Sequence, residues 1–434
     1  MEKNSFFLRG DIIWSASLET LNTAENGFLL CENGKSGGVF AKIPEKHMNL
    51  PVRDYSGKLI IPGLTDLHIH APQYSFRALG MDMELLEWLN KITFPEEARY
   101  SDLEYARRAY RHFVDDIKKG ATTRLCVFAT IHTGGTLLLM DMLEESGLVS
   151  LTGKVSMDRN CPDFLNEGSS AAAAKATVEW LKVFFERKEK GHYKNTFPIL
   201  TPRFIPSCSD ELMQSIADIQ KESGLSIQSH LSENRKEIEW VKELCPKSEN
   251  YAAAYAEAGL LEGNTIMAHC VWSDEREMEI LAEKGVYIAH CPQSNTNLSS
   301  GIAPVRRFLE KRIPAGLGSD VAGGAHTSIF RMMSDAIGVS KLRQVLGSGE
   351  KALTLEEAFF LGTAGGGSFF EKAGAPFGKA GSFEEGWDFD AIIIDDSSLV
   401  TERKPGVKER LERVVYLSDD RHIAGKYVRG RKII

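Results

Sequence analysis

Eight short apolar runs lie between residues 59 and 321, and stretches with helical periodicity separate most of them. The runs span residues 59–68, 122–129, 151–157, 198–203, 225–230, 265–269, 286–290 and 313–320. Strands that alternate with helices predict a parallel sheet. Eight such units are the number that closes as a (β/α)8 barrel, so the sequence predicts an α/β fold with a TIM-type barrel.

Three of the intervening helices have recognisable ends. We expect each to begin at a serine and to end at a glycine, in the pairs Ser101 and Gly120, Ser209 and Gly224, and Ser273 and Gly285. Ser101 and Glu104 also have the spacing of a capping box. These helix ends separate the predicted strands clearly.

Both ends of the chain read as short strands without a convincing long helix. Strand-like pieces occur at residues 27–31, 387–394, 413–417 and 422–428, and turn signals occur at 32–34 and 36–38. Because each end alone is too small to bury a sheet face, we predict one small β-sandwich lobe formed by both. The predicted domains are residues 1–58 and 378–434 for this lobe, and residues 59–377 for the catalytic barrel.

Acidic residues outnumber basic ones, and the formal charge is -8 at pH 7. Phosphate binding needs clustered Lys and Arg, so we expect a small-molecule partner and no nucleic acid. The sequence has no apolar run near the length of a membrane span and no leader pattern at its start. We therefore expect a cytoplasmic protein without membrane contact. The 7 cysteines are scattered, which predicts neither a disulfide framework nor a thiolate zinc site.

Histidines and an aspartate stand at the ends of several predicted strands. His68 and His70 flank Ile69, and because side chains alternate along a strand, both imidazoles should point to the same side. An isolated pair of this kind is as often two ordinary histidines as two ligands. Other strand ends, however, carry His230, His269, His290 and Asp320. Active sites of such barrels lie at these strand ends, so the sequence predicts a metal-dependent enzyme.

Imidazole nitrogens with a carboxylate oxygen suit zinc, and iron, manganese or nickel would also fit. We expect one zinc ion, held by His68, His70, His230 and Asp320. These ligands leave a position open for a water molecule whose pKa the metal lowers. His269 either binds the ion or orients the water, and we favour the second role. His290 precedes Cys291 and Pro292, and we expect it to anchor a turn.

Two carboxylates are candidates for proton transfer. Glu233 stands three residues after His230 and should face the same cavity. A loop glutamate is usually solvated, but a carboxylate among cations in a closed pocket can serve as general acid and base. Asp320 can act both as a ligand and as the group that passes the water proton to a leaving group.

These motifs resemble those of the amidohydrolase superfamily. The likeness lies in PGLTDLHIHAPQY (62–74), SHLSE (229–233), the HC pair at 269 and the GLGSD that ends at 320. More narrowly, the chain resembles the guanine deaminase family in HAPQYSFRALGMD (70–82), LLEWLNKITFPEE (85–97), TPRF (201–204) and HCPQSN (290–295). The resemblance implies that a metal-activated water converts guanine into xanthine and ammonia. It also implies zinc and a homodimer.

The family's functional residues fall on matching positions of this sequence. The metal ligands fall on His68, His70, His230 and Asp320, and the catalytic groups on Glu233, Asp320 and His269. Purine binding falls on Gln73, Arg203 and Phe204, together with Glu233 and His269. Arginine is a charge-assisted donor for a purine carbonyl, and glutamine can both donate and accept. The one departure is Gln293, where the family pattern has Asn.

Two other functions remain open from the sequence. A related deaminase would act on an oxidised guanine, a pterin, cytosine or a triazine, and only the surroundings of Gln73 and Arg203 would discriminate. A non-catalytic barrel scaffold would have lost ligands that this chain keeps. Trp88 and Phe204 could stack on a flat base, although aromatics at a barrel rim as often only pack. We expect residues 80–100 to form part of a lid or a dimer contact.

Overall fold

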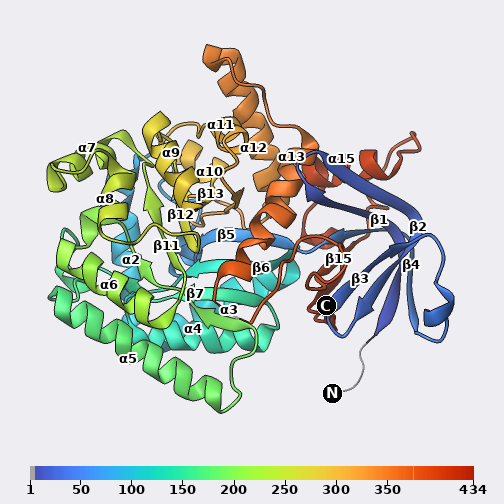
Figure 1. Cartoon of the computed structure of the whole chain (residues 1–434), viewed down its shortest axis with the longest axis horizontal. Coiled ribbons are helices and arrows are strands. Elements are labelled where there is room, and N and C mark those ends of the chain that lie inside the picture. Colours follow the sequence, from blue (N-terminus) through green and yellow to red (C-terminus); the bar gives the residue numbers. More distant parts are fainter. Residues whose placement is uncertain (1–4, 375) are drawn as a thin grey trace.

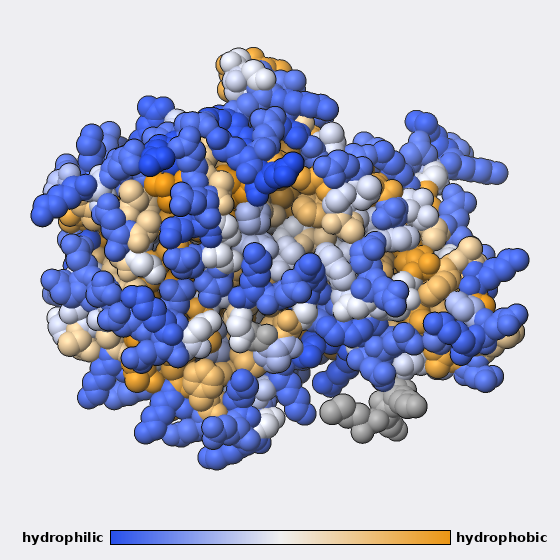
Figure 2. All heavy atoms as spheres, viewed as in Figure 1, coloured by the Kyte–Doolittle hydropathy of each residue, from blue (hydrophilic) through white to orange (hydrophobic). Residues whose placement is uncertain are grey.

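The computed structural model describes residues 5–374 and 376–434. Figure 1 shows parallel strands surrounded by helices on one side of the molecule, and a separate sheet made from both ends of the chain on the other. The fold is therefore mixed α/β, as predicted. Hydrophilic side chains cover most of the face seen in Figure 2. Within the described part of the chain, no helix is both long and apolar enough to cross a membrane.

Each predicted run contains strand residues of the larger part, which form two parallel four-stranded sheets. The first has the order β5 (Leu64–His70), β6 (Thr122–Phe128), β7 (Val149–Gly153) and β9 (Thr196–Pro198). The second has the order β11 (Ile227–Leu231), β12 (Thr265–His269), β13 (Tyr287–His290) and β14 (Ala315–Leu317). A short parallel pair joins β8 (Val155–Ser156) and β10 (Thr201–Pro202).

Individual backbone hydrogen bonds link the edges of these two sheets. At one junction, Leu200 N donates to Ser226 O at 2.8 Å and Gln228 N donates to Leu200 O at 3.0 Å. At the other junction, Asp320 N donates to His68 O at 2.8 Å. The segment after β9 thus adjoins β11, and the segment after β14 adjoins β5. A continuous eight-stranded sheet is not among the sheets of the described residues.

The first predicted strand divides into two strands of different sheets. Residues 59–62 end β4 (Val52–Pro62), which pairs with strands from both chain ends, and β5 begins at Leu64. Gly63 makes the passage between the sheets, since a Cβ there would lie 2.2 Å from Thr123 Oγ1 and 2.9 Å from Asp390 Cβ. The predicted boundary between residues 58 and 59 therefore cuts through β4.

Helices alternate with the parallel strands. The longer ones are α3 (Leu103–Lys119), α4 (Thr133–Ser146), α5 (Ser170–Glu189), α6 (Asp210–Ser223), α7 (Arg235–Leu244), α9 (Glu275–Lys284) and α12 (Ile329–Arg343). The shorter ones are α1 (Leu85–Trp88), α2 (Phe94–Ala98), α8 (Tyr251–Glu257), α10 (Pro292–Asn297), α11 (Val305–Glu310), α13 (Leu355–Phe360) and α14 (Phe369–Lys372).

Two predicted helix starts are wrong by one residue. Asp102 caps α3 in place of Ser101, and Asp274 caps α9 in place of Ser273. Each aspartate accepts hydrogen bonds from backbone N–H groups of the first turn, where its negative charge also suits the positive end of the helix dipole. Ser209 caps α6 as predicted. The predicted glycines Gly120, Gly224 and Gly285 follow the last residues of α3, α6 and α9.

The two chain ends form one seven-stranded sheet. Its order is β17 (Arg431–Lys432), β16 (Ile423–Val428), β15 (Ala391–Ile394), β4, β1 (Phe6–Ser17), β2 (Thr20–Glu32) and β3 (Lys35–Phe40). Both chain ends thus contribute to one small lobe, as predicted. The strands of this lobe form a single sheet among the described residues, so the predicted β-sandwich is not shown. The strand predicted at 413–417 is wrong, because these residues lie in α15 (Val407–Leu417), which buries Leu411, Val414 and Val415 at helical spacing.

A buried ion cluster connects this sheet to β6. Arg124 Nη2 lies 2.8 Å from Asp388 Oδ2, and Arg124 Nε lies 2.6 Å from Asp390 Oδ2. All three side chains are almost fully buried. Buried charges are tolerated when they are paired and hydrogen-bonded, so the cluster fixes one docking arrangement of the sheet on the strands.

Candidate active site

His68 and His70 lie at the end of β5, with their imidazoles on the same side as the strand alternation predicts. His68 Nε2 and His70 Nε2 are 3.2 Å apart, and both side chains are buried. Desolvation lowers the pKa of both imidazoles, so both are neutral near pH 7. Neutral imidazoles present lone pairs that suit a divalent metal ion.

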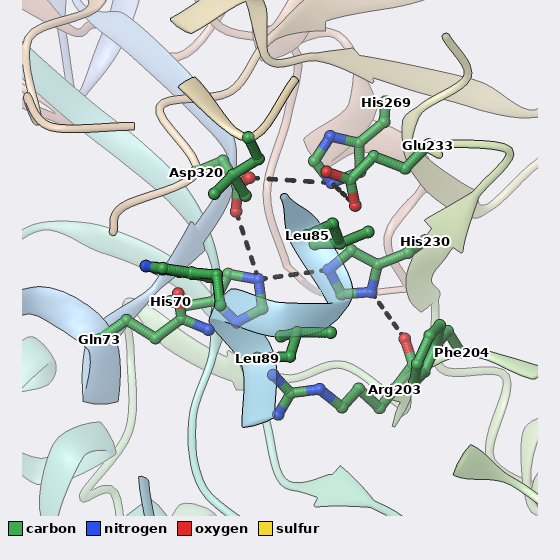
Figure 3. Close-up of a pocket in the computed structure, with 12 residues that line it drawn as sticks. His70, Gln73, Leu85, Leu89, Arg203, Phe204, His230, Glu233, His269 and Asp320 are labelled. Carbon is green, nitrogen blue, oxygen red and sulfur yellow. Dashed lines mark hydrogen bonds and ion pairs between the residues drawn. The ribbon is translucent and has the colours of Figure 1, made fainter. Parts of the chain in front are cut away.

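His230 brings a third imidazole to the same place from the end of β11 (Figure 3). Its Nδ1 donates to the carbonyl oxygen of Arg203 at 2.6 Å, and its Nε2 lies 3.3 Å from His70 Nε2. A bond of this kind fixes the tautomer with the proton on Nδ1, which leaves Nε2 free as a ligand. Desolvation also lowers the pKa of His230 well below its usual value.

Asp320 completes the cluster from the loop after β14. Its Oδ1 lies 3.1 Å from His68 Nε2 and 3.4 Å from His70 Nε2. Burial alone would raise the pKa of Asp320, but the imidazoles around it hold the pKa well below its usual range. The carboxylate is therefore ionised. It offers the negative oxygen that a divalent cation prefers beside nitrogen ligands.

Two overlapping groups of side chains could hold a metal ion. The first contains His68, His70 and His230, and the second contains His68, His269 and Asp320; ligand atoms within each group lie within 4.8 Å of one another. All four predicted ligands thus belong to these groups, and so does His269. Three neutral nitrogens and an ionised oxygen in one buried place fit a zinc-type ion, and His68 is common to both groups.

The strand ends around this cluster have unusual backbone conformations. His269 has a φ of 74°, Asp320 a φ of 45° and Ser232 a φ of 47°. Residues other than glycine rarely adopt such left-handed conformations, and when they do, they cluster at functional sites. Two of these residues, His269 and Asp320, line the pocket, and Ser232 immediately precedes Glu233, which also lines it.

His269 lies next to the two carboxylates predicted to move protons (Figure 3). Its Nε2 lies 3.5 Å from Glu233 Oε2 and 3.8 Å from Asp320 Oδ2, and its Nδ1 lies 2.8 Å from Asn295 Oδ1. Burial alone would lower the pKa of His269, but the carboxylates of Glu233 and Asp320 raise it. Asn295 was not predicted as a site residue, although it belongs to the HCPQSN motif.

Glu233 is buried beside the cluster, as predicted. Burial raises its pKa to about 7, against the opposing effect of His269. Ser300 Oγ donates to Glu233 Oε1 at 3.0 Å, which leaves Oε2 on the side of His269. A carboxyl group with a pKa near neutrality can both give and accept a proton at working pH. Ser300 carried no signal in the sequence, because serines of this kind are common in loops.

A pocket with about 410 Å³ of empty space, its open mouth included, lies against these groups. Its polar lining contains the predicted Gln73, Arg203, Glu233, His269 and Asp320, together with His70 and His230 (Figure 3). Its apolar lining contains the predicted Phe204, together with Leu85, Trp88, Leu89 and Leu298. A pocket that combines apolar and aromatic walls with convergent polar groups suits a small flat molecule.

The segment predicted as a lid or dimer contact forms part of this pocket. Leu85, Trp88 and Leu89 have the i, i+3, i+4 spacing of one helix face, and all three line the pocket. Glu97, from the same segment, bonds to Gln73 and Arg203. The sequence did not identify Glu97, because PEE after an apolar stretch reads as the exposed first turn of a helix.

Among the described residues that line the pocket, none belongs to the HCPQSN motif, so His290 and Gln293 both lie outside it. His290 is buried, neither of its ring nitrogens has a hydrogen-bond partner among the described residues, and burial lowers its pKa to about 3. Its carbonyl accepts from Gly318 N at 2.9 Å. Gln293, the departure from the family pattern, accepts from Ala325 N at 2.8 Å and donates to Asp335 Oδ2 at 3.0 Å. Its longer side chain therefore fastens the loop that follows Asp320.

Comparisons with known proteins agree with this geometry. A model of the amidohydrolase family matches residues 59–433. The guanine deaminase of Dictyostelium discoideum is 40% identical over 386 residues, which cover 88% of this chain and 84% of that protein. The guanine deaminase of Homo sapiens is 39% identical over 387 residues, covering 87% and 83%. A crystal structure of guanine deaminase from C. acetobutylicum with guanine bound in the active site has a TM-score of 0.93 and 41% identity, covering 99% of this chain and 100% of that one. The chain belongs to the amidohydrolase family, and within it to the guanine deaminases.

Proposed function

We propose that this protein deaminates guanine hydrolytically to xanthine and ammonia. The observation that carries the proposal is one pocket in which Gln73 and Arg203 stand opposite Glu233, His269 and Asp320, beside the histidine cluster (Figure 3). Gln73 and Arg203 can recognise the edge of a purine. The three groups opposite them can move protons at the carbon that carries the amino group. Relatives about 40% identical over most of the chain are named guanine deaminases, which supports the same activity.

We propose His68, His70, His230 and Asp320 as the residues that hold one divalent ion, zinc by preference, with iron as the alternative. The support is the converging neutral nitrogens and the ionised carboxylate. Such an ion lowers the pKa of a coordinated water toward neutrality. His269 would orient the water, because its Nδ1 is held by Asn295 and its Nε2 faces both carboxylates.

The protein's own groups would handle the protons of the reaction. Glu233 donates a proton from Oε2 to ring nitrogen N3 while water adds at C2, so that negative charge does not build up on the ring. Asp320 accepts a proton from that water and passes it to the amino nitrogen, which leaves as ammonia. The hydroxyl left on C2 then returns a proton to Glu233 Oε2 and becomes the carbonyl oxygen of xanthine. The net change is addition of one water and loss of one ammonia. Ser300 restrains Glu233 at Oε1, and this restraint supports the role given to Oε2.

Recognition of the ring would rest on Gln73, Arg203 and Phe204, with Glu233 and His269 on the reacting side. Arg203 provides charge-assisted donors for the purine carbonyl, and Gln73 provides one donor and one acceptor. Phe204 and Trp88 supply apolar walls to the pocket. Rings that lack the carbonyl would leave buried donors unpaired, which is the physical basis for selecting guanine over other aminated heterocycles.

We further propose that the two four-stranded sheets are halves of one closed (β/α)8 barrel, because backbone hydrogen bonds join them at both edges. We also propose the domain division at residues 58 and 378, in which β4 (Val52–Pro62) passes from the small lobe into the start of the barrel part. A cytoplasmic location and a role in purine catabolism also stay proposals. Buried, unbridged thiols such as those of Cys126 and Cys208 are usual in a reducing compartment, which supports that location.

A homodimer is proposed on the basis of one exposed apolar tip. α12 and the π-helical turn Gln344–Ser348 project from the molecule as the orange arm at the top of Figure 1. Leu342, Val345 and Leu346 are 54%, 76% and 78% exposed on this arm, and Figure 2 shows apolar atoms at its tip. Exposed apolar side chains grouped in this way favour a protein contact, and a second copy is the occupant that the family resemblance suggests.

The activity can be tested by following the ultraviolet spectrum of guanine during incubation with the purified protein. We expect conversion to xanthine, release of one ammonia per guanine, and loss of turnover after treatment with a chelator. The same sample should contain about one zinc or iron per chain by elemental analysis. Parallel assays with a pterin, cytosine and a triazine test the alternative substrates. Faster turnover of any of these than of guanine would contradict the proposed substrate.

A further inference from the structure

Glu97 contacts both side chains that we propose to recognise the ring. Its Oε1 accepts from Gln73 Nε2 at 2.9 Å and from Arg203 Nη2 at 3.2 Å, and its Oε2 accepts from Arg203 Nη1 at 2.5 Å. All three side chains belong to buried residues: Glu97 is 4% exposed, Gln73 is 2% exposed and Arg203 is 3% exposed. Glu97 lies on α2, whereas Gln73 follows β5 and Arg203 follows β10. One buried carboxylate therefore connects two strand ends to the wall of the pocket.

The contacts of Gln73 permit only one orientation of its amide. Ala322 N donates to Gln73 Oε1 at 3.1 Å, and Gln73 Nε2 donates to the carboxylate of Glu97 at 2.9 Å. A donor on one side and an acceptor on the other define which end is oxygen and which is nitrogen. Gln73 can then offer the second hydrogen of Nε2 and the second lone pair of Oε1 to a ligand, each from a fixed position. A ring with a carbonyl beside an N–H can pair with both, because its carbonyl accepts from Nε2 and its N–H donates to Oε1. If the amide were flipped, the same ring edge would face a like group at each position.

Arg203 is restrained by the same helix in two ways. Glu97 binds two of its nitrogens side by side, and the Phe94 ring lies 5.1 Å from its guanidinium carbon. The paired groups fix the guanidinium plane, because both hydrogen bonds must lie in it. They also cancel each other's charge. The arginine hydrogens that Glu97 leaves unused can therefore bind a neutral carbonyl without making the pocket a site for anions.

We propose that Glu97 is a positioning residue that selects rings carrying a carbonyl next to an N–H. It does so by setting the amide order of Gln73 and the guanidinium plane of Arg203. This inference rests on the proposed function, since it assumes that the pocket binds a purine. Glu97 acts through its two partners, and it is not among the residues that line the pocket.

The test compares two ligands by titration calorimetry, so it does not depend on turnover. Hypoxanthine carries the C6 carbonyl beside N1–H, and unsubstituted purine lacks both groups. Glu97→Gln keeps the shape but replaces an acceptor oxygen by an NH2 group, which leaves Gln73 free to flip. We expect the Kd for hypoxanthine to rise by about 10- to 100-fold, as loss of charge-assisted hydrogen bonds predicts, and the Kd for purine to stay within about threefold. Metal content should not change.

Glu96→Gln is the matched control. Glu96 precedes Glu97 on the same helix, but it bonds to Arg99 at 3.0 Å near the surface and takes no part in the pocket. Its substitution should leave both Kd values unchanged. Because Glu97→Gln leaves a buried arginine without its anion, Glu97→Asp is the second variant. It keeps the charge but is one methylene shorter and cannot hold both partners, so selectivity should fall there too.

The outcomes separate the two proposals. Wild-type selectivity for hypoxanthine in a folded Glu97→Gln or Glu97→Asp variant would overturn the positioning role. If neither variant folds, Glu97 serves the fold and not ligand selection, and the proposal is likewise overturned. A wild-type protein that prefers hypoxanthine to purine but does not deaminate guanine would refute the proposed function while leaving the role of Glu97 intact.

Discussion

Replacing Glu233 by Gln isolates the proton-transfer step from the rest of the site. Glutamine has the same shape and can still accept from Ser300 Oγ, which donates to Glu233 Oε1 at 3.0 Å. It cannot release or take up a proton at the position of Oε2. A positioned proton-transfer group contributes about 10²- to 10⁴-fold to a rate, so kcat for guanine should fall by that factor. This corresponds to about 3 to 5 kcal/mol of activation free energy.

The fold should not suffer from this substitution. Burial raises the pKa of Glu233 to about 7, so the ionised carboxylate is unfavourable in the folded protein. A neutral amide removes that cost, and thermal unfolding should occur at the same or a higher temperature. The assay is steady-state turnover of guanine with elemental analysis of the same sample. Wild-type kcat in a variant that keeps its metal would refute the role of Glu233, and loss of the metal would mean that Glu233 is a ligand.

Three further perturbations test other parts of the structure. Arg203→Met should raise KM for guanine at least about tenfold while metal content stays constant, because the side chain contacts Glu97 and Phe94 and, as proposed, the ring. Loss of zinc would contradict this role. Burial lowers the pKa of Lys426 from 10.5 to about 7. Between pH 7 and pH 10.5 the unfolded chain therefore binds more protons than the folded protein, so the free energy of unfolding should rise with pH in this range. Denaturant titrations of Lys426→Met should lack that rise. Leu346→Glu should convert a dimer into a monomer in light-scattering measurements, and an unchanged mass would exclude the arm as the interface.

The cluster of histidines and Asp320 could be predicted from the sequence because its residues stand at the ends of strands whose positions are readable. Once eight strands are placed in order, the residues that follow them must meet at one end of the parallel sheets. His68, His70, His230 and Asp320 meet in this way, but strand-end position alone does not distinguish them from His290, which also ends a strand and lies outside the pocket. The pocket residues Gln73, Arg203 and Phe204 also follow strands, but the choice among strand-end residues came from the resemblance to the family.

The residues that hold these groups in place could not be predicted in the same way. Glu97, Asn295 and Ser300 reach the site from helices and loops, and their partners lie far away in the sequence. No spacing rule connects Glu97 with Arg203, because their contact depends on how the segment before α3 folds over the strand ends. Positions of this kind are fixed by tertiary packing.

The errors at the element boundaries have local physical causes. The run at 59–68 looked like one strand because both of its halves are apolar, and only the close packing at Gly63 divides it. The run at 413–417 is too short for its period to distinguish a strand from the last turn of a helix. In the first case the residues are strand residues as predicted but belong to two sheets, and in the second only Val414 and Val415 are buried and the element is a helix.

The central claim is that His68, His70, His230 and Asp320 bind one ion next to the pocket. Anomalous X-ray diffraction from crystals of the purified protein, recorded on both sides of the zinc absorption edge, tests it most directly. The account predicts one anomalous peak per chain, between the Nε2 atoms of His68 and His230 and the carboxylate of Asp320. The absence of a peak at the zinc, iron, manganese and nickel edges, or a peak elsewhere in the molecule, would contradict it.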